Sequence, residues 1–188
     1  MPLNLQMGGE GSAYIRFKPT ENAWFMSGPD GPTEFEWSSS VVIDIENVEL
    51  GWLYLGVGIS EWEPWPDNIK TDRPTEGEFK VAAKIKLFSK KLFGEDGVRE
   101  LRSNQAGVMQ FIQDLYADAE PNFQKGVPVV EITGSNPVKI GKGSTRIPQH
   151  IIKKFVDRPD ALANGHAKPE TGNTKADSAD ADDDDDEF

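Results

Sequence analysis

The sequence predicts a mainly β protein: a small β-barrel with one principal α-helix and an acidic C-terminal tail. Several short runs of alternating apolar and polar residues are separated by Gly- and Pro-rich segments, which is the pattern of strands and turns. One segment, residues 104–120, instead has apolar residues at the three- and four-residue spacing of a helix. The final residues are rich in Asp and poor in large apolar side chains.

Six segments have the composition of strands, because their residues are β-branched or aromatic or alternate in polarity. They are Ser12–Lys18, Val41–Val48, Gly51–Val57, Glu78–Phe88, Val127–Thr133 and Ile147–Val156. Two stretches between them, residues 27–32 and 61–77, contain Gly and Pro and are predicted to be loops. Trp62 and Trp65 lie in the second loop, where they either stack on a ligand or pin the loop to the body. The flanking acidic residues favour the pinning role.

The helix can be capped by Ser103 or Asn104, and it stops before Pro121. Several strands, one helix and two further strands fit the OB-fold, a barrel used for binding oligonucleotides. A β-sandwich crossed by one helix would produce the same pattern. We therefore expect an OB-fold-like small β-barrel over residues 12–158. A flexible N-terminus of residues 1–11 precedes it, and a disordered acidic C-terminal tail of residues 159–188 follows it.

Composition excludes several classes of site. The 188 residues contain no Cys and only two His, His150 and His166, which fall in different regions. We therefore expect no disulfide, no zinc site and no cofactor. The N-terminal residues lack the pattern of a signal peptide, and no apolar run reaches transmembrane length, so we expect a cytoplasmic protein.

The formal net charge of −12 is distributed unevenly. Residues 1–69 carry a net charge of −9, and residues 161–188 carry −7. Residues 70–158 contain sixteen Lys and Arg against eleven Asp and Glu, a net charge of +5. A basic segment of this kind is what a polyanionic ligand would contact.

Three of the predicted strands combine an aliphatic face with a face of aromatic and basic residues. Residues two apart share a face, so Leu53, Leu55 and Val57 are expected inside the barrel. The opposite faces carry Tyr14, Arg16, Lys18, Trp52, Tyr54, Lys80, Lys84, Lys86 and Phe88. Single-stranded nucleic acid binds to such a mixture, because phosphates attract cations and unstacked bases stack on aromatic rings.

Further basic residues could bind additional phosphates along the backbone of a nucleic acid. They are Lys90, Lys91, Arg99, Arg102, Lys139, Lys142, Arg146, Lys153 and Lys154. Two alternatives stay open at this point. Outward lysines on strands are often only solvated, and Trp52 and Tyr54 could be buried beneath the helix or a loop.

Two motifs suggest catalysis. Residues 141–145, Gly-Lys-Gly-Ser-Thr, lack the spacing of a phosphate-binding loop and are predicted to form a basic hairpin turn.

Residues 66–80 resemble the Pro-Asp…Glu-x-Lys arrangement of Mg-dependent nucleases. In such an enzyme Asp67 and Glu78 would hold the metal, and Lys80 would assist the attacking water. Nuclease activity is thus one alternative function.

The chain ends in six acidic residues and an aromatic one: Asp182, Asp183, Asp184, Asp185, Asp186, Glu187 and Phe188. An aromatic ring behind an acidic run is suited to docking, since the ring fills a pocket while the acids meet a basic rim. This ending resembles that of bacterial and phage single-stranded DNA-binding proteins, particularly the phage replication type. Those proteins consist of an OB-fold body and a disordered acidic tail. Glu187 stands where the bacterial tails usually have Pro.

The resemblance implies a non-catalytic protein that binds and protects single-stranded DNA during phage DNA replication or recombination. It also implies that the tail recruits replication proteins such as a polymerase, helicase or primase, and that the tail competes with DNA for the basic groove. The sequence leaves monomer and homodimer open. A second alternative is an acidic interaction protein or DNA mimic that uses residues 1–69 as its binding face.

Overall fold

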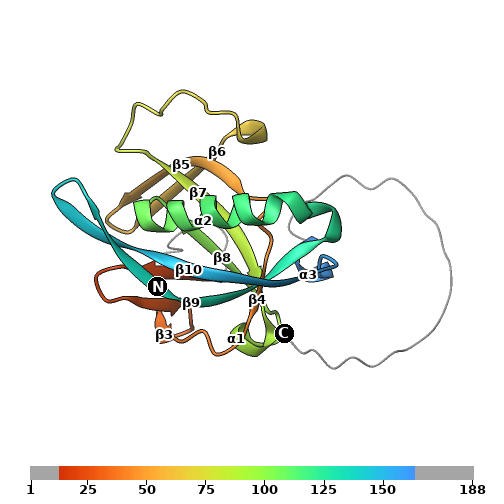
Figure 1. Cartoon of the computed structure of the whole chain (residues 1–188). Coiled ribbons are helices and arrows are strands. Elements are labelled where there is room, and N and C mark those ends of the chain that lie inside the picture. Colours follow the sequence, from red (N-terminus) through yellow and green to blue (C-terminus); the bar gives the residue numbers. More distant parts are fainter. Residues whose placement is uncertain (1–12, 164–188) are drawn as a thin grey trace, which may run out of the picture.

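A single strongly curled β-sheet of ten strands dominates the computed structural model, which describes residues 13–163 (Figure 1). The strands are β1 (Tyr14–Lys18), β2 (Ala23–Met26), β3 (Thr33–Phe35), β4 (Val41–Ile43), β5 (Glu49–Gly56), β6 (Ile59–Pro64), β7 (Lys80–Phe88), β8 (Val98–Ser103), β9 (Val127–Ile140) and β10 (Gly143–Val156). The helices are α1 (Lys90–Phe93), α2 (Ala106–Ala119) and α3 (Asp160–Ala163), with 3₁₀ turns η1 (Pro66–Asn68) and η2 (Glu120–Lys125). The predicted mainly β class is confirmed.

The sheet curls into a half-barrel. Its strand order is β10-β9-β4-β7-β8-β1-β2-β3, and β5 pairs with both β7 and β6. Within this order β4–β5, β7 and β8 form an antiparallel meander, α2 follows, and the β9–β10 hairpin returns to pair with β4. This is the connectivity of an OB-fold-like barrel, in which β7 and β8 occupy the places of strands 2 and 3.

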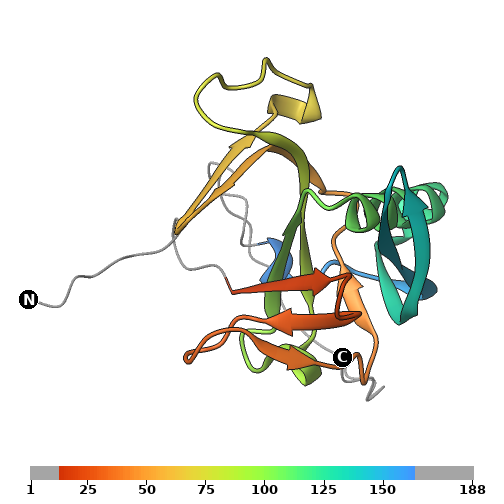
Figure 2. The same ribbon diagram turned by 90° about the vertical axis from the view of Figure 1, so that its left-hand side faces the viewer.

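Helix α2 covers the inner side of the curled sheet and closes the main core. Ile85 of β7, Leu101 of β8 and Phe111 of α2 are almost completely buried in one cluster. Gly107 allows α2 to approach β10 closely, because a Cβ atom there would lie 2.1 Å from the carbonyl oxygen of Arg146. Figure 2 shows α2 and the β9–β10 hairpin on one side of β7 and β8, with the β5–β6 hairpin reaching out on the other.

The predicted helix is confirmed, with a small difference at its start. Gln105 is the N-cap residue and makes no capping hydrogen bond through its side chain. The hydroxyl of Ser103 instead accepts the backbone N–H of Gln105 at 3.1 Å. The predicted hairpin turn around residues 141–145 is also confirmed, and Gly141 has the positive φ of 58° that such a tight turn favours.

Four strands, β2, β3, β6 and β8, were not predicted. Strand β8 contains three charged residues, Arg99, Glu100 and Arg102, and Leu101 is its one fully buried aliphatic residue. Strand β6 contains two acids and Pro64, and it pairs only with β5. Strands with so many charged residues, or with Pro, do not match the apolar alternation by which strands are recognised in a sequence.

The C-terminal part of the described chain crosses the outer side of the sheet. Leu162 of α3 is 1% exposed and packs in a cluster that includes Val42 and Phe88. Arg158 donates to the buried carboxylate of Asp44, with Nη2 and Oδ1 separated by 3.0 Å, and to Glu46 at 3.1 Å. The body therefore continues to residue 163, beyond the predicted boundary at 158.

Residues 1–11, which were predicted to be flexible, and the acidic tail after residue 163, including Phe188, lie outside the described residues. Among residues 13–163, no helix is long and apolar enough to cross a membrane.

Candidate nucleic-acid interface

One surface of the sheet combines basic and aromatic side chains, and it lies on the side opposite the main core. The register pairs Lys84 with Arg102 across β7 and β8. Lys86 lies opposite Glu100, which in turn lies opposite Tyr14 of β1. Paired residues of neighbouring strands point to the same side of a sheet, so these side chains share one surface. We call it the outer face; its main residues are Tyr14, Arg16, Lys18, Phe25, Trp62, Lys84, Lys86, Glu100 and Arg102.

The β1–β2 part of the outer face places two cations beside one aromatic ring. The guanidinium carbon of Arg16 lies 5.8 Å from the ring centroid of Phe25, and Nζ of Lys18 lies 4.4 Å from it. Both distances allow an attractive cation–π interaction. Tyr14, which precedes them on the same face, is 38% exposed. An exposed ring beside cations is an arrangement on which an unpaired base can stack while its phosphate is neutralised.

The β6–β8 part repeats this arrangement around Trp62. Nζ of Lys84 and the guanidinium carbon of Arg102 lie 5.5 and 5.4 Å from the Trp62 ring centroid. Gly51 leaves room for the ring, because a Cβ atom there would come within 2.9 Å of it. Trp62 is therefore held against the sheet by its neighbours, with its ring half-buried.

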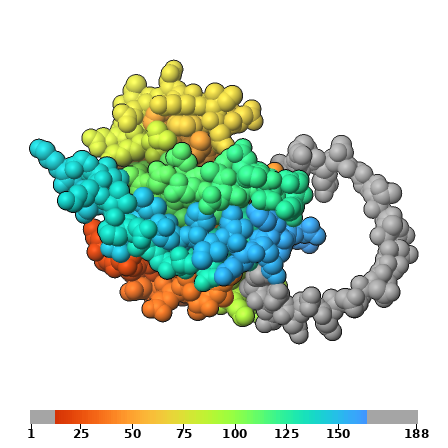
Figure 3. All heavy atoms as spheres, in the orientation of Figure 1, coloured from red at the N-terminus to blue at the C-terminus, as the bar shows by residue number. Residues whose placement is uncertain are grey.

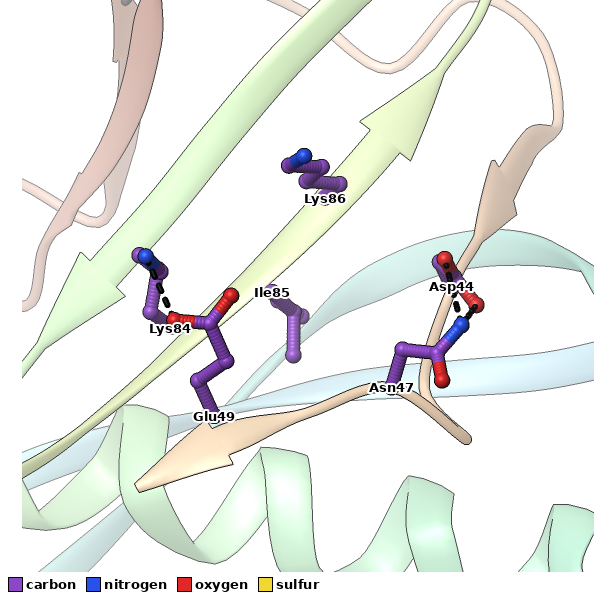
Figure 4. Close-up of a pocket in the computed structure, with 6 residues that line it drawn as sticks. All are labelled: Asp44, Asn47, Glu49, Lys84, Ile85 and Lys86. Atoms are coloured by element: carbon purple, nitrogen blue, oxygen red, sulfur yellow. Dashed lines mark hydrogen bonds and ion pairs between the residues drawn. The ribbon is translucent and has the colours of Figure 1, made fainter. Parts of the chain in front are cut away.

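Acidic residues neutralise both cations beside Trp62. Lys84 Nζ lies 2.6 Å from Glu49 Oε2, and Arg102 Nη2 lies 2.6 Å from Glu100 Oε1. Figure 4 shows the first of these pairs, and shows Lys86 without an interaction with the other residues drawn. Within residues 13–163, neither Arg16 nor Lys86 has an ion pair. These two residues carry the unpaired positive charge of the outer face.

The crevice drawn in Figure 4 is too small for a ligand. It lies between Asp44, Asn47 and Glu49 on one side and β7 on the other, and its volume is about 10 Å³. A volume of this size holds at most one water molecule. The outer face is thus a filled surface on which an extended ligand could lie.

Trp52 is not on the outer face, so the predicted placement of this residue is wrong. It is 4% exposed and packs with Trp65 and Phe79 in a separate cluster. The loop of residues 65–79 covers it, and Trp52 Nε1 donates to the hydroxyl of Thr71 at 3.1 Å. Tyr54 lies beside the same cluster, with its ring centroid 5.6 Å from that of Phe79. Trp65 pins the loop, as the favoured interpretation predicted.

Phe88 and the aliphatic face of β5 also differ from the prediction. Phe88 points to the outer side, but it packs against Leu162 of α3 and does not present an open ring. Leu55 is 59% exposed and Val57 is fully exposed, although both were expected inside the barrel. The register pairs Leu53 with Lys80 and Trp52 with Val81, so β5 turns its aliphatic face to the outer side, the reverse of the prediction. Leu55 and Val57 follow on the part of the β5–β6 hairpin that extends away from the rest of the sheet (Figure 2).

The remaining predicted residues lie away from the centre of the outer face. Lys90 and Lys91 are exposed on α1, and Lys80 is exposed at the start of β7. Lys142 is at the tip of the β9–β10 hairpin, which projects from the body (Figure 3). The other three are on β10: Arg146 donates to the Ser135 hydroxyl at 2.8 Å, Lys153 pairs with Glu131 at 2.5 Å, and Lys154 is exposed.

The residues of the nuclease hypothesis are only partly brought together. Glu78 and Lys80 line one open depression at the end of β7, whereas Asp67 lies in η1 and does not line it. Within the described part of the chain, no group of three or more His, Asp or Glu side chains could hold a metal ion.

Two outer-face residues were not singled out from the sequence: Phe25 and Glu100. Trp62 was considered as a stacking residue or a loop pin, and it lies in strand β6 on the outer face. Phe25 lies on a four-residue strand, too short to show alternation. Phe25 directly follows Trp24, which is buried, and this is the one local signal that the two rings face opposite sides of the sheet.

Comparisons of the chain with protein-family models, with curated proteins and with solved structures found no match.

Proposed function

We propose that this protein binds single-stranded DNA, without strong sequence selection, on the outer face of β7, β8 and β1. The observation that carries the proposal is the combination of Tyr14, Arg16 and Phe25 with Lys86 on one surface. Rings there can stack with bases, and two unpaired cations can bind phosphates. The position of this surface supports the proposal, because OB-fold barrels bind oligonucleotides on the face of strands 2 and 3.

The proposed role is protection of single-stranded DNA during replication or recombination. The ending Asp182–Phe188, which resembles the tails of phage single-stranded DNA-binding proteins, would recruit replication enzymes and compete with DNA. The path of the chain supports competition. Leu162 packs on Phe88, two residues from Lys86 on the same side of β7, so the tail follows a segment bound next to the outer face.

Anisotropy of a fluorescent dT oligonucleotide, titrated with the full chain at low salt, tests the proposal. Saturable binding that weakens as salt rises is expected, because phosphate contacts release counterions. Absence of binding at low salt would remove the proposal and favour an acidic interaction protein. Cleavage of the oligonucleotide that requires Mg²⁺ and is lost in Glu78→Ala would instead establish a nuclease.

Deleting residues 177–188 tests the competing tail. The truncated chain is expected to bind dT more tightly than the full chain at low salt, because eight acidic residues no longer compete with phosphate. The difference should shrink as salt screens the charges. Equal or weaker binding by the truncated chain at low salt would contradict competition, while leaving DNA binding itself intact.

A further inference from the structure

An open depression lies at the end of β7, beyond the cations of the outer face. Its volume is about 730 Å³, and it is lined by Tyr54, Leu55, Gly77, Glu78, Lys80 and Asn104. Lys80 is on the same side of β7 as Lys84, four residues away, which corresponds to about 13 Å along a strand. A strand of DNA lying along β7 would therefore reach the depression.

The wall of the depression is built around the ring of Tyr54. A Cβ atom at Gly77 would lie 3.0 Å from this ring, and one at Gly56 would lie 2.8 Å from its hydroxyl oxygen. Gly77 also has a positive φ of 102°, which favours glycine. Side chains other than hydrogen at these two positions would displace the ring. The two glycines thus keep an aromatic wall in place beside the apolar side chain of Leu55.

The polar side chains of the depression have no partners among the residues that the structure describes. Within residues 13–163, the side chains of Glu78, Lys80 and Asn104 form no hydrogen bond or ion pair. Glu78 can only accept hydrogen bonds, Lys80 can only donate them, and Asn104 can do both. A free phosphate would be repelled by Glu78, whereas a nucleotide offers a base edge to Glu78 and Asn104 and a phosphate to Lys80.

Resting on the proposed function, we infer that the depression holds one base of the bound strand and favours a base with an exocyclic amino group. A carboxylate accepts a hydrogen bond from N4 of cytosine, and an Asn side chain can pair with adenine. Thymine has a carbonyl oxygen where cytosine has its amino group, and the carboxylate of Glu78 would repel this oxygen. The protein therefore prefers cytosine to thymine at one position of an otherwise sequence-tolerant site.

The experiment compares dC and dT homopolymers of about 15 nucleotides, bound to the full chain and followed by anisotropy. Both are pyrimidines, and they differ in the hydrogen-bonding groups at C4 and N3 and in the C5-methyl group of thymine. The wild-type chain is expected to bind dC about 5- to 10-fold more tightly than dT. Glu78→Gln should bring this ratio close to one, because an amide can both donate to thymine and accept from cytosine. Asn104→Ala should weaken binding of both oligonucleotides and keep the ratio, because the Asn amide can likewise donate to thymine and accept from cytosine.

Glu76→Gln is the matched control, because Glu76 is an exposed acid of the same loop that does not line the depression. It removes the same charge, so it should tighten binding to both oligonucleotides equally and must preserve the dC to dT ratio. Equal binding of dC and dT by the wild type overturns the inference and leaves the proposed function standing. Loss of the ratio in Glu76→Gln also overturns it, since the preference would then come from general charge. Failure to bind either oligonucleotide removes the proposed function itself.

Discussion

Of the three aromatic rings in residues 13–163 that have two cations close by, Phe25 lies in an open cluster and Trp52 in a closed one. On the outer face, Arg16 and Lys18 flank Phe25, and Tyr14 beside them is exposed. Under the loop of residues 65–79, Lys70 and Arg73 lie 5.5 and 5.7 Å from the ring centroid of Trp52, which is buried. The chemistry of the contacts is the same in both clusters.

The difference lies in where the cations come from. Arg16 is a strand residue, fixed on the sheet beside an exposed ring, so the cluster has a free side for a ligand. Lys70 and Arg73 belong to the covering loop itself, so the loop already occupies the position that a ligand would take above Trp52. An aromatic ring with cations is therefore a binding surface only where no segment of the chain covers it. The two clusters should respond to mutation in opposite ways.

Trp52→Ala is expected to have the largest effect, and the effect should be on stability. Removing a buried Trp side chain costs about 3–5 kcal/mol of unfolding free energy, because it leaves a cavity beside Trp65 and Phe79. Urea unfolding measures this loss. Ile69→Ala in the same loop is the control, since Ile69 is exposed and its loss should change stability by less than about 0.5 kcal/mol. A stable Trp52→Ala variant with strongly weakened DNA binding would contradict the conclusion that Trp52 belongs to a closed cluster with a structural role.

The sequence predicted elements whose pattern is local. The stripe of apolar residues in α2 and the turn at Gly141 can be recognised within a few residues, and both are confirmed. The assignment of Lys84 and Lys86 to the side opposite the core is confirmed for a similar reason. Strand β7 runs through the centre of the sheet, so the apolar residues of its alternating pattern are the ones that pack in the core.

The sequence failed where a distant segment decides which side is covered. Leu53, Leu55 and Val57 alternate like core residues, but the register with β7 puts Leu53 opposite Lys80 on the outer side, and the projecting β5–β6 hairpin leaves Leu55 and Val57 exposed. Trp52 is buried because residues 65–79 fold back over it, which no local pattern records. The neutralisation of Lys84 by Glu49 likewise depends on the register between β5 and β7.

Tyr14→Leu is expected to weaken binding of dT by about 1–3 kcal/mol, because each base stacked on an aromatic ring contributes this amount. Stability should change little, since Tyr14 is an exposed strand residue. Tyr14→Phe is the matched control: it keeps the ring and should keep the affinity. The affinities are measured by anisotropy at one salt concentration. Equal affinity of the Leu and Phe variants would show that no base stacks at this position.

Lys86 and Lys84 provide the finest test, because they differ in charge compensation while lying two residues apart on one face of β7. Lys86→Ala is expected to reduce the slope of log affinity against log salt by about 0.7, the value for one phosphate contact with a single strand. Lys84→Ala should change the slope less, since Glu49 already neutralises Lys84 at 2.6 Å. The slopes are measured between about 50 and 200 mM salt. Glu49→Gln should then raise the slope, because it frees Lys84 for a phosphate. Identical slopes for the two Ala variants would mean that bound DNA displaces Glu49, and the outer face would then carry more positive charge in the complex than in the free protein.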